Sequence, residues 1–157
     1  MLAYKNQAVI YNFTENFDIP YKESNAIFNE TKKWLWACYY SKRDPKYTDI
    51  AMTIDDSIII IDKMWHTFIL FTRAYHDFCH TYFSRFIHHT PTSYQEKQLR
   101  KTRLRTNRTE TLNKERKERE RLLSYLYDTL GKHTIIKWYV EYREKYTPAI
   151  VLEKTKK

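Results

Sequence analysis

The sequence predicts an all-α fold, a small helical bundle that carries a charged insertion. Apolar residues recur at spacings of three, four and seven along several segments, which is the pattern of helices that bury one face. One glycine and four prolines are too few for the tight hairpins of a β-sandwich or barrel. The chain has 157 residues, 42% of them hydrophobic, so we expect one helical domain spanning 1–157.

Two helices are expected in the first third of the chain. A short one covers residues 2–13. A longer one covers residues 21–41, where Ile27, Trp34 and Cys38 repeat at helical spacing after Pro20. Residues 43–53 contain Pro45 and are expected to form a loop.

The middle of the chain predicts two consecutive helices. Asp55 to Ser57 supply N-cap chemistry for an apolar helix that runs to about residue 71. Thr72 is the expected cap of a second helix that runs to about Phe86, and Pro91 ends this unit in a loop.

Two further helices are expected after the charged insertion. Leucines and a tyrosine between residues 122 and 130 form a helical stripe, and Gly131 stands in the position of a C-terminal cap. Residues 135–142 form the next helix, with Pro148 beyond its end, and the tail 153–157 is expected to be frayed.

Most of the positive charge lies in one segment. Residues 97–121 contain eleven lysines and arginines and four glutamates, so they carry +7 of the formal net charge of +9. Residues 96–121 have too few apolar side chains to bury a face, and are therefore expected to be a basic insertion, either an exposed helix or a disordered linker. The cations that define this basic arm are Lys97, Arg100, Lys101, Arg103, Arg105 and Arg108.

The basic arm allows two interpretations. It is a solvated spacer between core helices, or it contacts nucleic acid or an acidic protein surface by neutralising negative charge. Interleaved aromatic residues and the spacings of known nucleic-acid-binding motifs are absent from it.

Several classes of protein are excluded by the sequence. Both common glycine-rich phosphate loops need at least two glycines, and this chain has one. We expect no transmembrane segment, because no run of about 18 uncharged apolar residues occurs. No signal-peptide pattern is visible, so a cytoplasmic location is expected, although export by a non-classical route would leave the same sequence.

The segment 62–91 holds five of the six histidines and one of the two cysteines. Asp62 and His66 are four residues apart on one helix, so the carboxylate can orient the imidazole or join it at a metal. His66, Cys79 and either His88 or His89 are candidate ligands for Zn²⁺ or another transition metal. The expected pocket consists of Asp62, Trp65, His66, Tyr75, Cys79, His88 and His89.

Structural interpretations of the same residues stay open. His66 is then a buried imidazole satisfied by Asp62, Cys79 is a small core residue, and His88 and His89 cap a helix C-terminus. Catalysis by a Cys79 thiolate is a further alternative, but a position in mid-helix on the apolar side disfavours it.

The pattern D-x-x-W-H, I-L-x-T-x-x-Y, F-C and F-x-x-F-I-H-H-x-P resembles the glycine-rich-domain-protein-like family, especially its small stand-alone bacterial members. The resemblance implies an all-helical fold and no established activity. Ser84 replaces a glycine usual in that family, which would let the helix continue, and Phe68 replaces the second histidine of a frequent W-H-x-H form. The matching positions are Asp62, Trp65, His66, Ile69, Leu70, Thr72, Tyr75, Phe78, Cys79, Phe83, Phe86, Ile87, His88, His89 and Pro91.

Two functions follow from these observations. The first is a small helical protein with a His/Cys/Asp pocket that binds a metal. The second is an interaction module that uses its basic arm. Neither names a substrate or a reaction, so whether the protein is an enzyme stays open.

Overall fold

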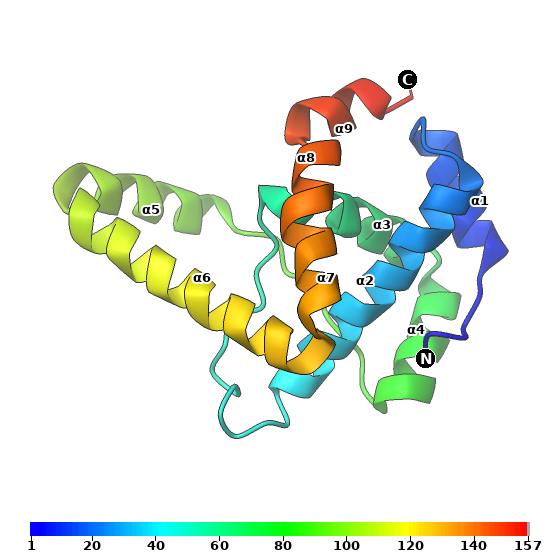
Figure 1. Ribbon diagram of the computed structural model, residues 1–157, viewed down its shortest axis with the longest axis horizontal. Helices are drawn as coiled ribbons and strands as arrows, with labels where there is room; N and C mark the ends of the chain where they lie inside the picture. Colours follow the sequence, from blue (N-terminus) through cyan, green and yellow to red (C-terminus); the bar gives the residue numbers. More distant parts are fainter. Residues whose placement is uncertain (157) are drawn as a thin grey trace.

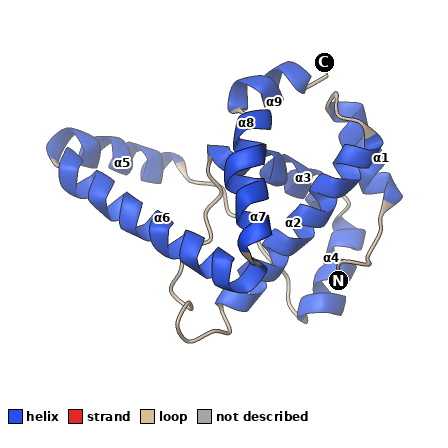
Figure 2. Ribbon diagram, viewed as in Figure 1, coloured by secondary structure: helices blue, strands red, loops and turns tan. Residues whose placement is uncertain are grey.

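The computed structural model describes residues 1–156, and within them the protein is built from helices without a β-sheet (Figures 1 and 2). The all-α prediction is therefore confirmed. The elements in chain order are α1 (Gln7–Asn16), α2 (Tyr21–Ser41), the 3-10 turn η1 (Asp56–Ile58), α3 (Ile59–Leu70), α4 (Thr72–Phe83), α5 (Tyr94–Thr106), α6 (Arg108–Leu130), α7 (Lys132–Ile136), the π-helical segment η2 (Lys137–Tyr142), α8 (Arg143–Lys145) and α9 (Pro148–Lys154).

The helix α2 forms the centre of the body and packs against α1, α3 and α6. Aromatic rings fill the space between these helices. Phe68 of α3 lies 5.1 Å from Phe28 of α2 and 5.3 Å from Phe78 of α4, measured between ring centroids. Burial of such large apolar side chains is the main force that holds the body together.

The N-terminal segment is attached through a buried lysine. The Lys32 ammonium on α2 donates hydrogen bonds to the carbonyls of Leu2 and Tyr4 at 2.8 and 2.5 Å. Burial lowers the pKa of Lys32 to about 8. The first helix begins at Gln7 rather than at residue 2, because the Asn6 side chain accepts a hydrogen bond from the amide of Val9 and caps it there.

Ser84 ends α4 earlier than the sequence predicts. The helix was expected to reach Phe86, but its last residue is Phe83, and Ser84 adopts the left-handed conformation with φ 54°. The replacement of glycine by serine at this position does not let the helix continue. The chain turns instead, and residues 85–93 return toward α3 as a loop.

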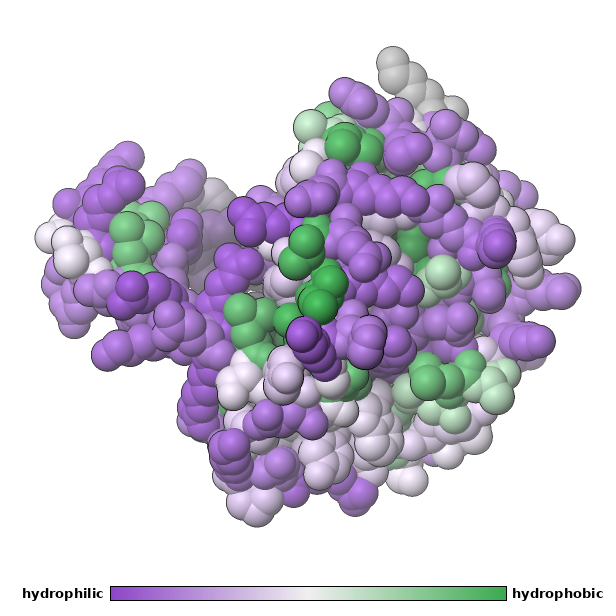
Figure 3. Space-filling model, viewed as in Figure 1, coloured by the Kyte–Doolittle hydropathy of each residue, from purple (hydrophilic) through white to green (hydrophobic). Residues whose placement is uncertain are grey.

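The charged insertion is a helical hairpin that projects from the body (Figure 1). We call α5 together with residues 108–121 of α6 the basic hairpin. Ser93 and Glu96 form a capping box at the start of α5, and the Arg100 guanidinium joins Glu115 of α6 through two hydrogen bonds of 2.7 and 2.9 Å. None of its residues is buried, and Figure 3 shows a largely hydrophilic surface there.

The C-terminal region differs from the sequence prediction. As expected, α6 ends at Gly131, whose φ of 82° suits glycine. The predicted helix 135–142 is longer and contains η2, which places Trp138 and Lys137 within 2.9 Å of the buried Glu30. The predicted fraying of the tail is wrong for residues 153–156, since α9 reaches Lys154 and Thr155 pairs with Phe17; residue 157 lies outside the described part.

Across the described residues, no helix combines the length and the apolar composition needed to cross a membrane.

Candidate metal centre

Asp62 and His66 face each other on α3. They are one helical turn apart, and the His66 Nδ1 atom lies 3.1 Å from Asp62 Oδ2. The separation of four residues in the sequence therefore brings the two side chains into contact, because residues four apart share a helix face.

His89 approaches the same carboxylate from the loop after α4. Its Nε2 atom lies 2.9 Å from Asp62 Oδ1, so one carboxylate bridges two imidazoles. The two imidazole rings are also neighbours, with centroids 4.4 Å apart. The turn at Ser84 makes this possible, since it directs the loop back across α3.

A buried hydrogen-bond chain holds that loop in place. The Trp65 indole N–H donates to the Tyr75 hydroxyl at 3.0 Å, and this hydroxyl donates to the carbonyl of Ile87 at 2.6 Å. Ile87 is two residues before His89, and the Trp65 and His89 rings also form a T-shaped contact with centroids 4.4 Å apart. Trp65 and Tyr75 thus position the histidine and contribute no ligand atom.

The group lies at the surface. The side chains of Asp62, His66 and His89 are 20%, 50% and 14% exposed. The interpretation of His66 as a buried imidazole is therefore wrong. Its position on α3 faces away from the core stripe of Ile61, Met64 and Phe68.

Cys79 does not join this group. It is fully buried on α4, where burial raises the pKa of its thiol and so disfavours the thiolate that a metal would require. Asp62, rather than Cys79, completes the set: within the described chain, one potential ligand atom from each of Asp62, His66 and His89 lies within 4.8 Å of the others. In the expected ligand set of His66, Cys79 and His89, Asp62 therefore replaces Cys79.

The other histidines of the segment contribute no atom to the three-residue group. His88 is exposed and its ring packs against Phe86 at 4.8 Å. His76 and His80 are exposed on α4, 4.3 Å apart between ring centroids. Of these three histidines, His88 lines the same cavity as Asp62, as predicted for the pocket, whereas His76 and His80 do not.

A cavity of about 600 Å³ opens beside the three side chains. Its apolar wall includes Ile54, Ile59 and Phe86, and Arg85 and Lys97 bring positive charge to its lining. The loop before η1 supplies Met52 and Thr53 as well as Ile54, and its residues 43–53 were expected only as a loop. No spacing or motif in that loop indicated its place in the wall.

The fold and this group define a class, an all-α protein with a carboxylate that bridges two histidines beside a surface cavity. A model of the UCP032817-like family, which is uncharacterised, matches residues 12–151, and the chain belongs to that family. No curated protein and no solved structure matches the chain. The resemblance to the glycine-rich-domain-protein-like family and the cytoplasmic location are not tested by this match and stay predictions.

Proposed function

We propose that the protein binds a divalent transition metal through Asp62, His66 and His89. The observation that carries the proposal is the convergence of one carboxylate oxygen and two imidazole nitrogens within 4.8 Å of one another. Ligands around a tetrahedral Zn²⁺ lie roughly 3.4 Å apart, given metal–ligand distances of about 2.0–2.1 Å. The imidazole nitrogens of His66 and His89 already lie 3.1 and 2.9 Å from the Asp62 oxygens, close to that spacing.

The chemistry of the donor set favours a transition metal. Imidazole suits Zn²⁺, Fe²⁺ and Cu²⁺, whereas Ca²⁺ and Mg²⁺ prefer oxygen ligands alone. Two histidines and one carboxylate also leave coordination positions open for water or a ligand, as in catalytic rather than structural zinc sites. The cavity of about 600 Å³ gives such a ligand room beside the ion.

The environment also fixes how the ligands are oriented. Before an ion binds, Asp62 contacts both rings, and the Trp65–Tyr75–Ile87 chain holds the loop that carries His89. Such partners hold the ligand side chains in a fixed orientation, so less conformational entropy is lost when a metal binds. Because His66 is half exposed, an ion reaches the group from solvent without opening the core.

The proposal is tested with protein purified without a histidine tag and stripped of metal. Zn²⁺ affinity is measured by competition with a chromophoric chelator. His66→Ala and His89→Ala should each abolish tight binding, and Asp62→Asn, which replaces the carboxylate ligand by a neutral amide, should weaken it by more than about 100-fold, beyond the loss caused by changing a residue outside the ligand set.

Two matched variants serve as controls. His76→Ala removes an exposed histidine from α4 and should leave the Zn²⁺ affinity unchanged. Cys79→Ser should also leave it unchanged, which separates the proposed ligands from the set that includes the thiol. Equal Zn²⁺ affinity in the wild type and in a folded His66→Ala/His89→Ala double variant would refute the proposal.

A further inference from the structure

The cations of the basic hairpin fall into two groups, those with an acidic partner and those without. All four glutamates between residues 97 and 121 have partners within the hairpin: Glu115 pairs with Arg100, Glu118 with Lys114, Glu120 with Arg116, and Glu110 accepts from Asn107. Arg119 and Arg121 pair with aspartates of the body. In the part of the chain that is described, no acidic partner lies within ion-pair distance of Lys97, Lys101, Arg103, Arg105, Arg108 or Lys117.

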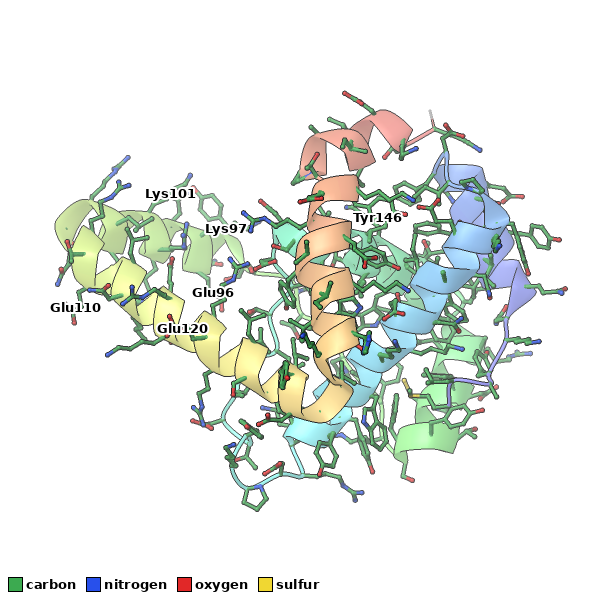
Figure 4. The ribbon with its side chains drawn as sticks, in the orientation of Figure 1. Glu96, Lys97, Lys101, Glu110, Glu120 and Tyr146 are labelled. Carbon is green, nitrogen blue, oxygen red and sulfur yellow. The ribbon has the colours of Figure 1, made fainter. Side chains whose placement is uncertain are left out.

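Five of these six unpaired cations lie on α5 or at the adjoining tip. From Lys97 to Arg108 the sequence has six lysines and arginines and no acidic residue. Figure 4 labels Lys97 where the hairpin meets the body, Lys101 farther out on α5, and Glu110 near the tip. The hairpin therefore has a neutralised side on α6 and a positively charged side on α5.

At several of these positions the positive charge does not stabilise the helix that carries it. Lys97, Lys101 and Arg105 follow one another at intervals of four, where like charges repel on a helix. Of these, only Arg105 lies in the last turn of α5, where the helix dipole favours a cation. Arg108 is the first residue of α6, the end at which the helix dipole disfavours a cation. A local stabilising role therefore does not explain Lys101 and Arg108, whereas an external anion does.

The shape of the hairpin favours a nucleic acid over other anionic partners. A projecting, exposed helix fits the width of the major groove of a duplex, and closely spaced cations match the regular charge of a phosphate backbone. A membrane surface is disfavoured, because α5 lacks the broad apolar face of an interfacial helix; Leu99 is the exposed aliphatic side chain that it offers. Tyr94 is 72% exposed at the start of α5 and is available to stack on a base.

We propose that the α5 side of the basic hairpin binds the phosphate backbone of a nucleic acid through Lys101, Arg105 and Arg108. This binding is independent of the metal centre. The contacts are to phosphates, so the affinity depends on charge and salt more than on base sequence.

The test is fluorescence anisotropy with the full chain and three labelled probes, a DNA duplex, the matching single strand and an RNA duplex, at several salt concentrations from about 50 mM upward. The three probes distinguish the kind of nucleic acid. Affinity for at least one probe should fall steeply as salt rises. The variant Lys101→Gln/Arg105→Gln should lower that affinity on the order of tenfold and reduce the slope of log affinity against log salt by about two.

The chain offers a matched control in the same hairpin. Lys114→Gln/Arg116→Gln removes the same two charges, but from residues that already pair with Glu118 and Glu120. It should change the affinity less than about twofold, since these cations contribute little to phosphate neutralisation. Circular dichroism of both variants checks that the hairpin remains helical.

Three results would overturn the proposal. No binding of the wild type to any probe at about 50 mM salt excludes a nucleic acid partner. An equal loss in the test and control variants shows that overall charge, not the α5 side, is responsible. Binding to polyglutamate or to phosphatidylserine vesicles as tight as binding to the nucleic acid probes assigns the hairpin to an acidic protein or a membrane instead.

Discussion

The body and the basic hairpin are both helical, but different forces hold them. In the body, apolar side chains from α2, α3, α4 and η2 are buried against one another, and rings such as Phe28 and Phe68 make direct contact. In the hairpin no residue is buried, and capping, the Arg100–Glu115 pair and ion pairs four residues apart support the helices. A helix in this protein is therefore no evidence of a core, and mutations should have unequal effects in the two regions.

Removal of an aromatic ring should show the largest difference. Phe68→Ala leaves a cavity among rings that are fully buried and should lower the free energy of unfolding by about 3–5 kcal/mol. Tyr94→Ala removes a ring that is 72% exposed on the hairpin and should change the free energy of unfolding by less than about 0.5 kcal/mol. Denaturant unfolding measures both, and similar losses would show that the hairpin also has a packed interior.

Removal of one hydroxyl in the body should have an intermediate effect. Tyr75→Phe leaves the Trp65 indole N–H and the Ile87 carbonyl without their partner, at a cost of about 1–3 kcal/mol. Tyr82→Phe, on the same helix, removes a hydroxyl for which no hydrogen bond occurs among the described residues, and should be nearly neutral. Thermal unfolding compares the two. An equally stable Tyr75→Phe protein would show that the loop with His89 is held by other contacts.

Loss of the ion pair between the two hairpin helices should have the smallest effect. Arg100→Ala should cost about 0.2–1 kcal/mol, the usual range for an exposed pair, and should speed amide hydrogen exchange in α5 while the body is unchanged. Arg103→Ala removes a cation that has no acidic partner among the described residues, and as the control it should leave both the stability and the exchange in α5 nearly unchanged.

The effect of Arg100→Ala should also depend on pH. Arg100 holds the pKa of Glu115 below its usual value of 4.5. The stabilisation is therefore fully present above about pH 4.5 and is lost as the pH falls through the lower pKa of the folded state. A difference between Arg100→Ala and the wild type that persists at about pH 2 would contradict the ion pair as its cause.

The periodic apolar segments explain why so much of the fold was predictable. The bounds of α2 match the predicted residues 21–41, because its apolar residues recur regularly and Pro20 marks its start. The early end of α4 was missed, since the left-handed conformation of Ser84 is uncommon for a residue other than glycine. The helix α9 was missed because Pro148 was interpreted as a stop, whereas at the first position of a helix it is a start.

The candidate site was predictable in part for the same physical reason. Spacing along one helix brings Asp62 to His66, so that contact follows from sequence alone. The approach of His89 to Asp62 spans 27 residues of sequence and depends on the path of the loop after α4, and no local pattern encodes that path. Cys79 was chosen as a ligand by residue type, but its place on the apolar stripe of α4 indicated the core instead.

The helix α6 has a mechanical consequence, because its 23 residues belong to both regions. An uninterrupted α-helix of this length is a stiff rod of about 35 Å. Near its middle, the Arg119 guanidinium lies 3.1 Å from the carboxylate of Asp55, which caps the turn that leads into α3. This ion pair therefore joins the rod that carries the hairpin tip to the turn that begins the helix with Asp62 and His66.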